Sequence, residues 1–428
     1  MKRLLWMPPV LLVIVLAAVW WRSQPHRQAS ISPESAEIAV LLKDPGVIAK
    51  GRYLATVGDC VSCHTARAGA PYAGGRMLPT PFGAIPAPNL TPDPDTGIGA
   101  WNFAEFWRAL HEGVGRNGEP LYPAFSYTSF TKVTRDDAIA VFAYLRSLPP
   151  VRQPNAPLAL RFPYNMRSTL AAWRTVYFKA GVYRPVAAQS AAWNRGAYLV
   201  QGLGHCNECH APRGTWGGVS TNTALSGGRI PEQDWYAPDL STQANGGLHG
   251  WSRQDLIDVL KTGQSAKGAA LGPMADVVSA STQYLHDDDV QAIADYLLSL
   301  PARAPPLPVQ ASFDSKALAD RGHALYMERC ADCHGTDGTG VPGVYPPLDG
   351  NASIVEPSGI NATRVVLLGG FPPVTEGNPR PYSMPPYAQQ LSDAEVAAVV
   401  TYIRQAWSNH ASAVQEREVA AYRHTPID

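Results

Sequence analysis

The sequence predicts a mainly α-helical protein that repeats one structural unit three times after an N-terminal apolar segment. Three observations predict this fold class. All six cysteines lie in three copies of one pentapeptide, Cys-x-x-Cys-His. Helical patterns recur in the same order around each copy, and an apolar run at residues 4–21 precedes the first unit. Such internal repetition predicts one domain for each pentapeptide.

The pentapeptide itself predicts the cofactor. Two cysteines three positions apart place both sulfurs on one side of a helical turn, where they can add to the two vinyl groups of a haem. The histidine that follows then lies under the ring and can bind the iron, so the pattern is the attachment signature of c-type haem. The candidate haem-binding residues are Cys60, Cys63, Cys206, Cys209, Cys330 and Cys333, and the candidate iron ligands are His64, His210 and His334.

Zinc binding and thiol redox chemistry are the alternatives for these cysteines. Zinc sites usually pair two Cys-x-x-Cys hairpins or add a later histidine pair, whereas these motifs lie roughly 125 to 145 residues apart. A thioredoxin-like centre has no use for the fixed histidine. Neither alternative explains three copies that use every cysteine. We therefore expect three covalently bound haems c.

Composition agrees with compact domains. Hydrophobic residues make up 45% of the chain, charged residues 16%, and the formal net charge is zero. This balance is not that of a disordered chain. The absence of a basic run argues against nucleic-acid binding. The 39 prolines and 37 glycines fit long, turn-rich loops around a prosthetic group.

The N-terminal segment predicts export and a membrane anchor. Lys2 and Arg3 precede the apolar run and Arg22 closes it. The run is just long enough for a spanning helix, and the positive charges place the preceding residues in the cytoplasm. We expect residues 1–22 to be an uncleaved transmembrane anchor, with the haem domains on the periplasmic side of a bacterial cytoplasmic membrane. A cleaved signal peptide is the alternative, because Pro8 and Pro9 shorten the helical piece.

Helical patterns flank each pentapeptide in a fixed order. A short helix precedes the first cysteine of each motif. Amphipathic helices at 101–113 and 251–263 end in a glycine, and a shortened version stands at 363–370. Each unit closes with a helix whose first turn is acidic, and Thr134 and Ser392 are predicted N-caps.

This order resembles the class I cytochrome c fold, in which the first and last helices cross and loops line the haem pocket. We expect three tandem domains of this class, and the predicted segments are 1–22 (anchor or signal), 45–150 (domain 1), 151–189 (linker region), 190–301 (domain 2), 302–313 (linker), 314–410 (domain 3) and 411–428 (tail). The aromatic-rich residues 162–178 are predicted to be helical and to pack domains 1 and 2 together. A surface for a partner subunit is the alternative for this segment.

A class I domain usually places a methionine on the far side of the iron, in a loop before the last helix. Met274 and Met384 follow their histidines by 64 and 50 residues and fit that place. In domain 1 the same register falls on Phe125, which cannot bind iron. Met77 is the candidate ligand there, with Met166 second; otherwise the first haem is five-coordinate. His111 is predicted to lie at a helix end rather than on the iron.

The three units in tandem resemble the trihaem cytochrome c subunits of membrane-bound bacterial dehydrogenases that act on alcohols, aldehydes or gluconate or are of the molybdenum-hydroxylase type. The resemblance covers about residues 45–410 and is carried by "GRYLATVGDCVSCHTA", "TPDPDTGIG", "LYPAFSYTSFTKV", "RGAYLVQGLGHCNECHAPR" and "YSMPPYAQQLSDAEVAAVVTYIR". It implies an electron-transfer subunit that has no catalytic residues and is not an enzyme on its own. Its catalytic partner would hold molybdenum, pyrroloquinoline quinone or flavin, and its acceptor would be ubiquinone or a terminal oxidase. Phe125 favours the molybdenum-hydroxylase group within that family.

A second function class is a self-contained haem enzyme, such as a peroxidase or nitrite reductase, that uses an open first haem. No distal pair of histidine and arginine stands near Phe125 in the sequence. The repeated architecture favours a row of relay haems over a single reactive one. We therefore expect electron transfer rather than catalysis by this chain.

Overall fold

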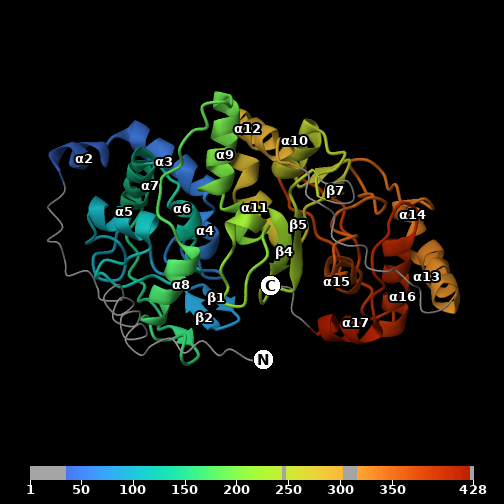
Figure 1. Ribbon diagram of the computed structural model, residues 1–428. Helices are drawn as coiled ribbons and strands as arrows, with labels where there is room; N and C mark the ends of the chain where they lie inside the picture. Colours follow the sequence, from blue (N-terminus) through green and yellow to red (C-terminus); the bar gives the residue numbers. More distant parts are fainter. Residues whose placement is uncertain (1–34, 243–246, 302–315, 425–428) are drawn as a thin grey trace, which may run out of the picture. The chain divides into compact units, whose positions relative to one another are not determined.

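The computed structural model describes residues 35–242, 247–301 and 316–424 and is mainly helical, as expected (Figure 1). The predicted anchor at 1–22 and the linker at 302–313 lie outside the described residues. Within the described ranges, no helix has the length and apolar character needed to cross a membrane.

The chain forms two compact units. Unit 1 comprises Met1–Ala55, Cys60–Arg184 and Thr215–Gly218, and unit 2 comprises Thr56–Asp59, Pro185–Gly214 and Val219–Asp428. By sequence, unit 1 holds 20 Lys and Arg against 10 Asp and Glu, whereas unit 2 holds 15 against 25. The neutral total therefore conceals a basic unit and an acidic unit.

Unit 1 contains the first pentapeptide between helices that match the predicted order. Its helices are α2 (Ala36–Leu41), α3 (Pro45–Val57), α4 (Cys60–Cys63), α5 (Phe103–Glu112), α6 (Tyr127–Phe130), α7 (Arg135–Ser147) and α8 (Thr169–Tyr177). Asn102 and Glu105 form a capping box at the start of α5, and Gly113 ends it with φ 62°. The Thr134 side chain accepts from the Asp137 backbone N–H and caps α7, which confirms the predicted N-cap.

The linker region belongs to unit 1. Strand β3 (Ala159–Leu160) pairs with β2 (Gly83–Pro86), which pairs with β1 (Met77–Thr80). The Tyr127 ring lies 4.9 Å from that of Phe178, and the Arg174 guanidinium stacks over both. Helix α8 is shorter than the predicted segment: residues 162–165 form a turn, and the helix begins only at Thr169.

Unit 2 contains the second and third pentapeptides. The second domain has α9 (Ala191–Gln201), η1 (Cys206–Glu208), η2 (Thr221–Thr223), β4 (Ser226–Ile230), β5 (Trp235–Asp239), α10 (Arg253–Thr262), β6 (Gln264–Ser265), β7 (Gly268–Ala269), α11 (Pro273–Ala280), η3 (Thr282–Tyr284) and α12 (Asp287–Leu298). The third has α13 (Lys316–Arg329), α14 (Ala331–His334), α15 (Ile360–Leu368), α16 (Asp393–Gln405) and α17 (Glu416–Arg423). Ser392 and Glu395 form a capping box on α16, so the second predicted N-cap is also confirmed.

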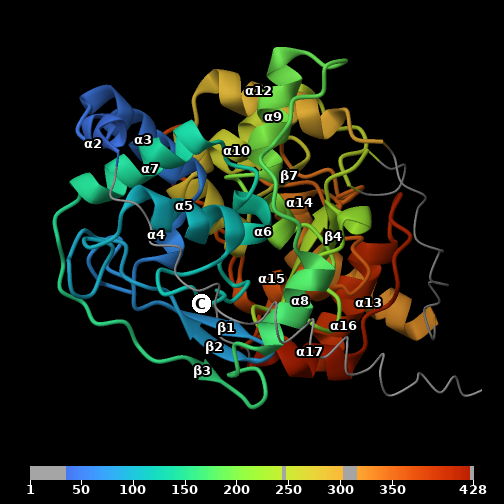
Figure 2. The same cartoon turned by 60° about the vertical axis from the view of Figure 1, so that its left-hand side comes forward.

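One helix crossing is built the same way in all three domains. The helix before the haem motif packs against the closing helix, and α9 and α12 lie side by side in both views (Figures 1 and 2). A glycine makes the close approach possible, since an added Cβ would come within 1.8, 1.9 and 2.4 Å of a backbone oxygen of the partner helix. The three pairs are Gly51 with Ala140, Gly196 with Ala292, and Gly322 with Ala398. This crossing holds the helix that precedes each Cys-x-x-Cys-His motif against the closing helix of its domain.

The second and third domains pack on each other within unit 2. The Asn361 side chain accepts from the Tyr236 N–H (2.9 Å) and donates to the Tyr236 carbonyl (2.8 Å). Gln264 donates to the Val344 carbonyl at 2.9 Å. Asn361 and Gln264 are both buried, so these polar contacts are part of a closed interface rather than a surface encounter.

Candidate haem-binding sites

Each cysteine pair lies on a single tight turn. The first pair bounds α4, the second begins at η1, and Cys330 is the N-cap of α14. In each motif the histidine N–H donates to the carbonyl of the first cysteine, at 3.1 Å for His64, 2.9 Å for His210 and 3.0 Å for His334. This bond closes the turn and holds the imidazole next to the two thiols.

The three imidazoles are oriented in the same way. Their Nδ1 atoms lie 2.8, 2.7 and 3.0 Å from the carbonyl oxygens of Pro88, Pro238 and Pro346. A carbonyl can only accept, so Nδ1 carries the proton and Nε2 keeps its lone pair. Burial lowers the pKa of all three histidines, against the smaller opposing effect of the carbonyl bond. Each histidine is therefore a neutral imidazole with Nε2 available for a metal.

The buried thiols do not suit a redox pair. Burial raises the pKa of Cys206 to about 12 and that of Cys330 to about 11, with the second cysteine of each motif adding to the effect. A thiol–disulfide centre needs a lowered thiol pKa. Across residues 35–242, 247–301 and 316–424, no three His, Cys, Asp or Glu side chains gather as a metal cluster.

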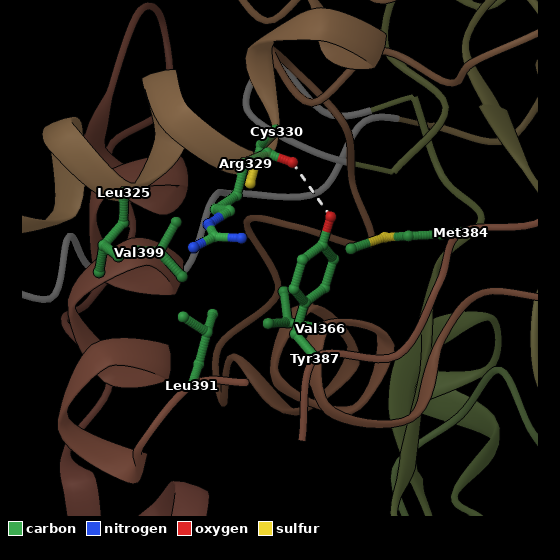
Figure 3. A pocket seen from close by; sticks show the side chains of 8 residues that line it. All are labelled: Leu325, Arg329, Cys330, Val366, Met384, Tyr387, Leu391 and Val399. Carbon is green, nitrogen blue, oxygen red and sulfur yellow. Dashed lines mark hydrogen bonds between the residues drawn. The ribbon is translucent and has the colours of Figure 1, made fainter. Parts of the chain in front are cut away.

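The third domain has a pocket beside its motif. Figure 3 shows Met384, Tyr387 and Cys330 around one space. The pocket is lined by Leu325, Arg329, Cys330, Val366, Met384, Tyr387, Leu391 and Val399. Met384 is fixed by two backbone bonds with Gly370, of 2.8 and 3.1 Å, and the Tyr387 hydroxyl donates to the Arg329 carbonyl at 3.1 Å. A cysteine of the third motif and the Met384 thioether thus line one apolar space.

In the second domain, Met274 lies in the first turn of α11, where Pro273 is in the N-terminal position that suits proline. Gly272 before it has φ 54°, and a Cβ there would come within 2.5 Å of the Trp235 ring. Met274 is half-buried. The Trp235 ring and the turn at Gly272 together fix where helix α11, and with it Met274, begins.

The first domain differs from the other two at the position where they have a methionine. Phe125 is half-buried, and its ring lies 5.3 Å from that of Phe130. Met77 begins strand β1 and is 42% exposed, and Met166 is 43% exposed. His111 lies in the last turn of α5, where its ring stacks on Trp107 at 4.5 Å. The helix-end position predicted for His111 is therefore confirmed.

Pro88, Pro238 and Pro346 are not among the site residues predicted from the sequence. A signal for them exists, because each begins a Pro-x-Leu triplet in its own domain. The triplets follow their histidines at unlike distances of 24, 28 and 12 residues. Because these distances differ, no fixed spacing after the histidine indicates the prolines.

The residues present fit a covalently attached haem. Each site offers two thiols on one turn, a neutral imidazole with a free Nε2 and, in the third domain, an apolar pocket. This is the donor set of haem c rather than of zinc, which would need further ligands close by.

The comparison with protein families agrees with this geometry. The model of the family described as cytochrome c matches residues 48–149, 194–301 and 319–407. These three matches cover more than half of the chain.

The chain belongs to the cytochrome c family. Membership of this family supports covalent attachment of haem c at the motifs described above. The three matched segments each contain one of the pentapeptides.

Three relatives carry informative names. The chain is 38% identical over 386 residues to "Alcohol dehydrogenase (quinone), cytochrome c subunit" of Gluconobacter oxydans (strain 621H), covering 86% of this chain and 80% of the relative. It is 38% identical over 396 residues to "Gluconate 2-dehydrogenase cytochrome c subunit" of Pantoea cypripedii, covering 88% and 89%. It is 41% identical over 389 residues to a nicotinate dehydrogenase subunit of Pseudomonas putida (strain KT2440), covering 88% of this chain and 32% of that protein. The predicted resemblance to cytochrome c subunits of dehydrogenases is therefore confirmed.

Proposed function

We propose that this chain is the electron-transfer subunit of a bacterial dehydrogenase complex and carries three covalent haems c. The observation that supports it best is the threefold repetition of one donor set: a thiol pair, a neutral histidine and a carbonyl that orients it. When bound, haem iron accepts and releases one electron at a time. Three such sites in one chain would form a relay, and the sequence offers no acid–base constellation for substrate chemistry beside them.

Each haem site has assigned residues in this proposal. Cys60 and Cys63 hold the first haem, Cys206 and Cys209 the second, and Cys330 and Cys333 the third, with His64, His210 and His334 as iron ligands. Met274 and Met384 would be the further iron ligands in domains 2 and 3, where a thioether would raise the reduction potential and leave no position for small molecules. Domain 1 has no methionine in that register, and Met77 is the alternative to an open position there.

The partner in this proposal is a catalytic dehydrogenase subunit. The names of the relatives, which are subunits of alcohol, gluconate and nicotinate dehydrogenases, support it. The catalytic partner would hold molybdenum, pyrroloquinoline quinone or flavin, with Phe125 favouring molybdenum. Electrons would pass on to ubiquinone or a terminal oxidase.

The proposed location is the periplasmic side of the cytoplasmic membrane. Lys2, Arg3 and the apolar run at 4–21 support an anchor at this place. An N-terminal sequence of mature protein that began after residue 20 would contradict the anchor but not the export.

Haem stoichiometry tests the proposal directly. Protein made in a host that matures cytochromes c should give three haems per chain in a pyridine haemochrome assay. Cys206→Ala with Cys209→Ala should leave two, because the thioether bonds cannot form. Cys330→Ala with Cys333→Ala is the matched variant for the third site and should also leave two. A count of zero or one for the unaltered chain would refute the proposal.

A donor assay tests whether the chain needs a partner. Haem-loaded protein, free of other subunits, should accept electrons from a chemical reductant. It should not reduce an artificial acceptor when an alcohol, an aldehyde or an N-heterocycle is the donor. Turnover with such a donor would favour a self-contained enzyme instead.

A further inference from the structure

One buried arginine connects the second and third domains. Arg364 lies in α15 and is 1% exposed. Its guanidinium carbon lies 5.0 Å from the centroid of the Trp235 ring, which begins β5 of the second domain. The two side chains therefore meet across the interface within unit 2.

Both residues of this contact lie next to segments of a candidate haem site, Trp235 in the second domain and Arg364 in the third. Trp235 packs on Gly272, two residues before Met274. Three residues beyond Trp235, the Pro238 carbonyl accepts from His210. On the other side, Val366 follows Arg364 by two residues and lines the pocket that contains Met384. The Trp235–Arg364 pair thus connects the segments that carry Met274 and Pro238 in the second domain with helix α15 of the third domain.

Neighbouring contacts hold helix α15 against strand β5. Asn361, one turn earlier on α15, is bonded to both backbone groups of Tyr236 and is 8% exposed. Tyr236 directly follows Trp235. This pairing fixes α15 against β5, so Arg364 stays over the ring.

A positive charge at the position of Arg364 is expected to change the electron affinity of the neighbouring haem sites. Arginine keeps its charge in proteins, and an aromatic face offsets part of the cost of removing it from water. A buried charge is screened far less than one at the surface. The reduced form of a haem site carries one negative charge more than the oxidised form, so a nearby cation favours reduction.

We propose that Arg364 raises the reduction potentials of the second and third haem sites and that Trp235 holds it in place to do so. This inference rests on the proposed electron relay. Arg364 is a positioning and charge-supplying residue in it and touches no substrate.

Potentiometric titration of the full-length haem-loaded protein tests the inference. At a fixed solution potential, Arg364→Met should lower the ratio of reduced to oxidised protein about tenfold for two of the three haems. For a one-electron couple this is a midpoint lower by about 59 mV. Arg364→Lys should shift much less because the charge remains. Trp235→Leu should give an intermediate shift, and all shifts should persist at high salt.

Arg174→Met is the matched control. The Arg174 guanidinium also stacks on rings, 5.4 Å from Tyr127 and 4.8 Å from Phe178, but in unit 1. Its removal should leave the midpoints of the two haems in unit 2 unchanged.

Two results would overturn the inference. The first is an unchanged set of midpoints in Arg364→Met, and the second is an equal shift in Arg364→Met and Arg364→Lys, which would show a packing effect only. Where Arg364→Met loses haem, Arg364→Gln and Trp235→Leu replace it, and the absence of a shift in both would be equally decisive. The haem count of the unaltered chain, measured first, tests the proposed function separately.

Discussion

Unit 1 and unit 2 build the histidine side of their candidate haem sites alike, and they differ at the position where a methionine is expected. His64 in unit 1 and His210 and His334 in unit 2 all bond a proline carbonyl through Nδ1. Unit 2 then offers Met274 and Met384 in matching register, whereas unit 1 offers Phe125. The histidine side thus combines a turn closed within five residues with one proline carbonyl from a later loop, and this arrangement recurs although the loops differ in length.

The first prediction concerns the stability of the two units, because both contain the glycine-mediated crossing between the helix before the motif and the closing helix. Gly196→Val should destabilise unit 2 by about 3 kcal/mol, because the new side chain overlaps the Ala292 carbonyl and the helices must move apart. Gly51→Val should do the same to unit 1 through Ala140. Calorimetry of the haem-loaded variants should show which unit has the lower melting temperature.

Gly181→Ala is the control for that experiment. A Cβ at Gly181 meets no atom within 4 Å, so its melting curve should match that of the unaltered chain. A Gly196→Val variant as stable as the Gly181→Ala control would show that the crossing does not hold the domain together.

Ligand substitution should separate the two units spectroscopically. Ferric haems with histidine and methionine ligands absorb weakly at about 700 nm. Met274→Ala with Met384→Ala should abolish this band, because the two substitutions remove both candidate thioether ligands of unit 2. Met77→Ala alone should leave the band unchanged. A remnant in the double variant that vanished only with Met77→Ala would assign a thioether to unit 1 as well.

Carbon monoxide tests whether the first haem has an open position. If neither Phe125 nor Met77 ligates its iron, reduced protein should bind the gas at one haem in three; Met77 lies in strand β1 and is 42% exposed. The measurement is the change in the haem absorbance on titration with the gas. No binding, together with an unchanged spectrum in Met77→Ala, would point to a sixth ligand outside those named.

The smallest expected effect concerns the interface that only unit 2 has. Asn361→Ala removes both bonds to the Tyr236 backbone and leaves buried polar groups unpaired, which should cost about 2 kcal/mol of unit 2 stability. Asn165→Ala, an exposed asparagine of unit 1, is the control and should change neither unit. Equal melting curves for both variants would mean that the second and third domains do not depend on this contact.

The features that the sequence predicted are those that depend on near neighbours. The cysteine turns, the caps at Thr134 and Ser392 and the glycine end of α5 each involve residues within a few positions of one another. The orienting prolines were missed because loops of unequal length separate them from their histidines. The Trp235–Arg364 contact joins two domains across 129 positions, and no local pattern indicates it.

The net charge of the whole sequence does not reveal how unevenly charge is distributed. An excess of ten basic residues in unit 1 cancels an excess of ten acidic residues in unit 2. For electrochemistry this cancellation has a practical consequence. A negatively charged electrode should adsorb the molecule through unit 1, and a positively charged electrode should adsorb it through unit 2. Voltammetry on the two electrodes should then differ, with the candidate haem site of unit 1 responding first on one and those of unit 2 on the other.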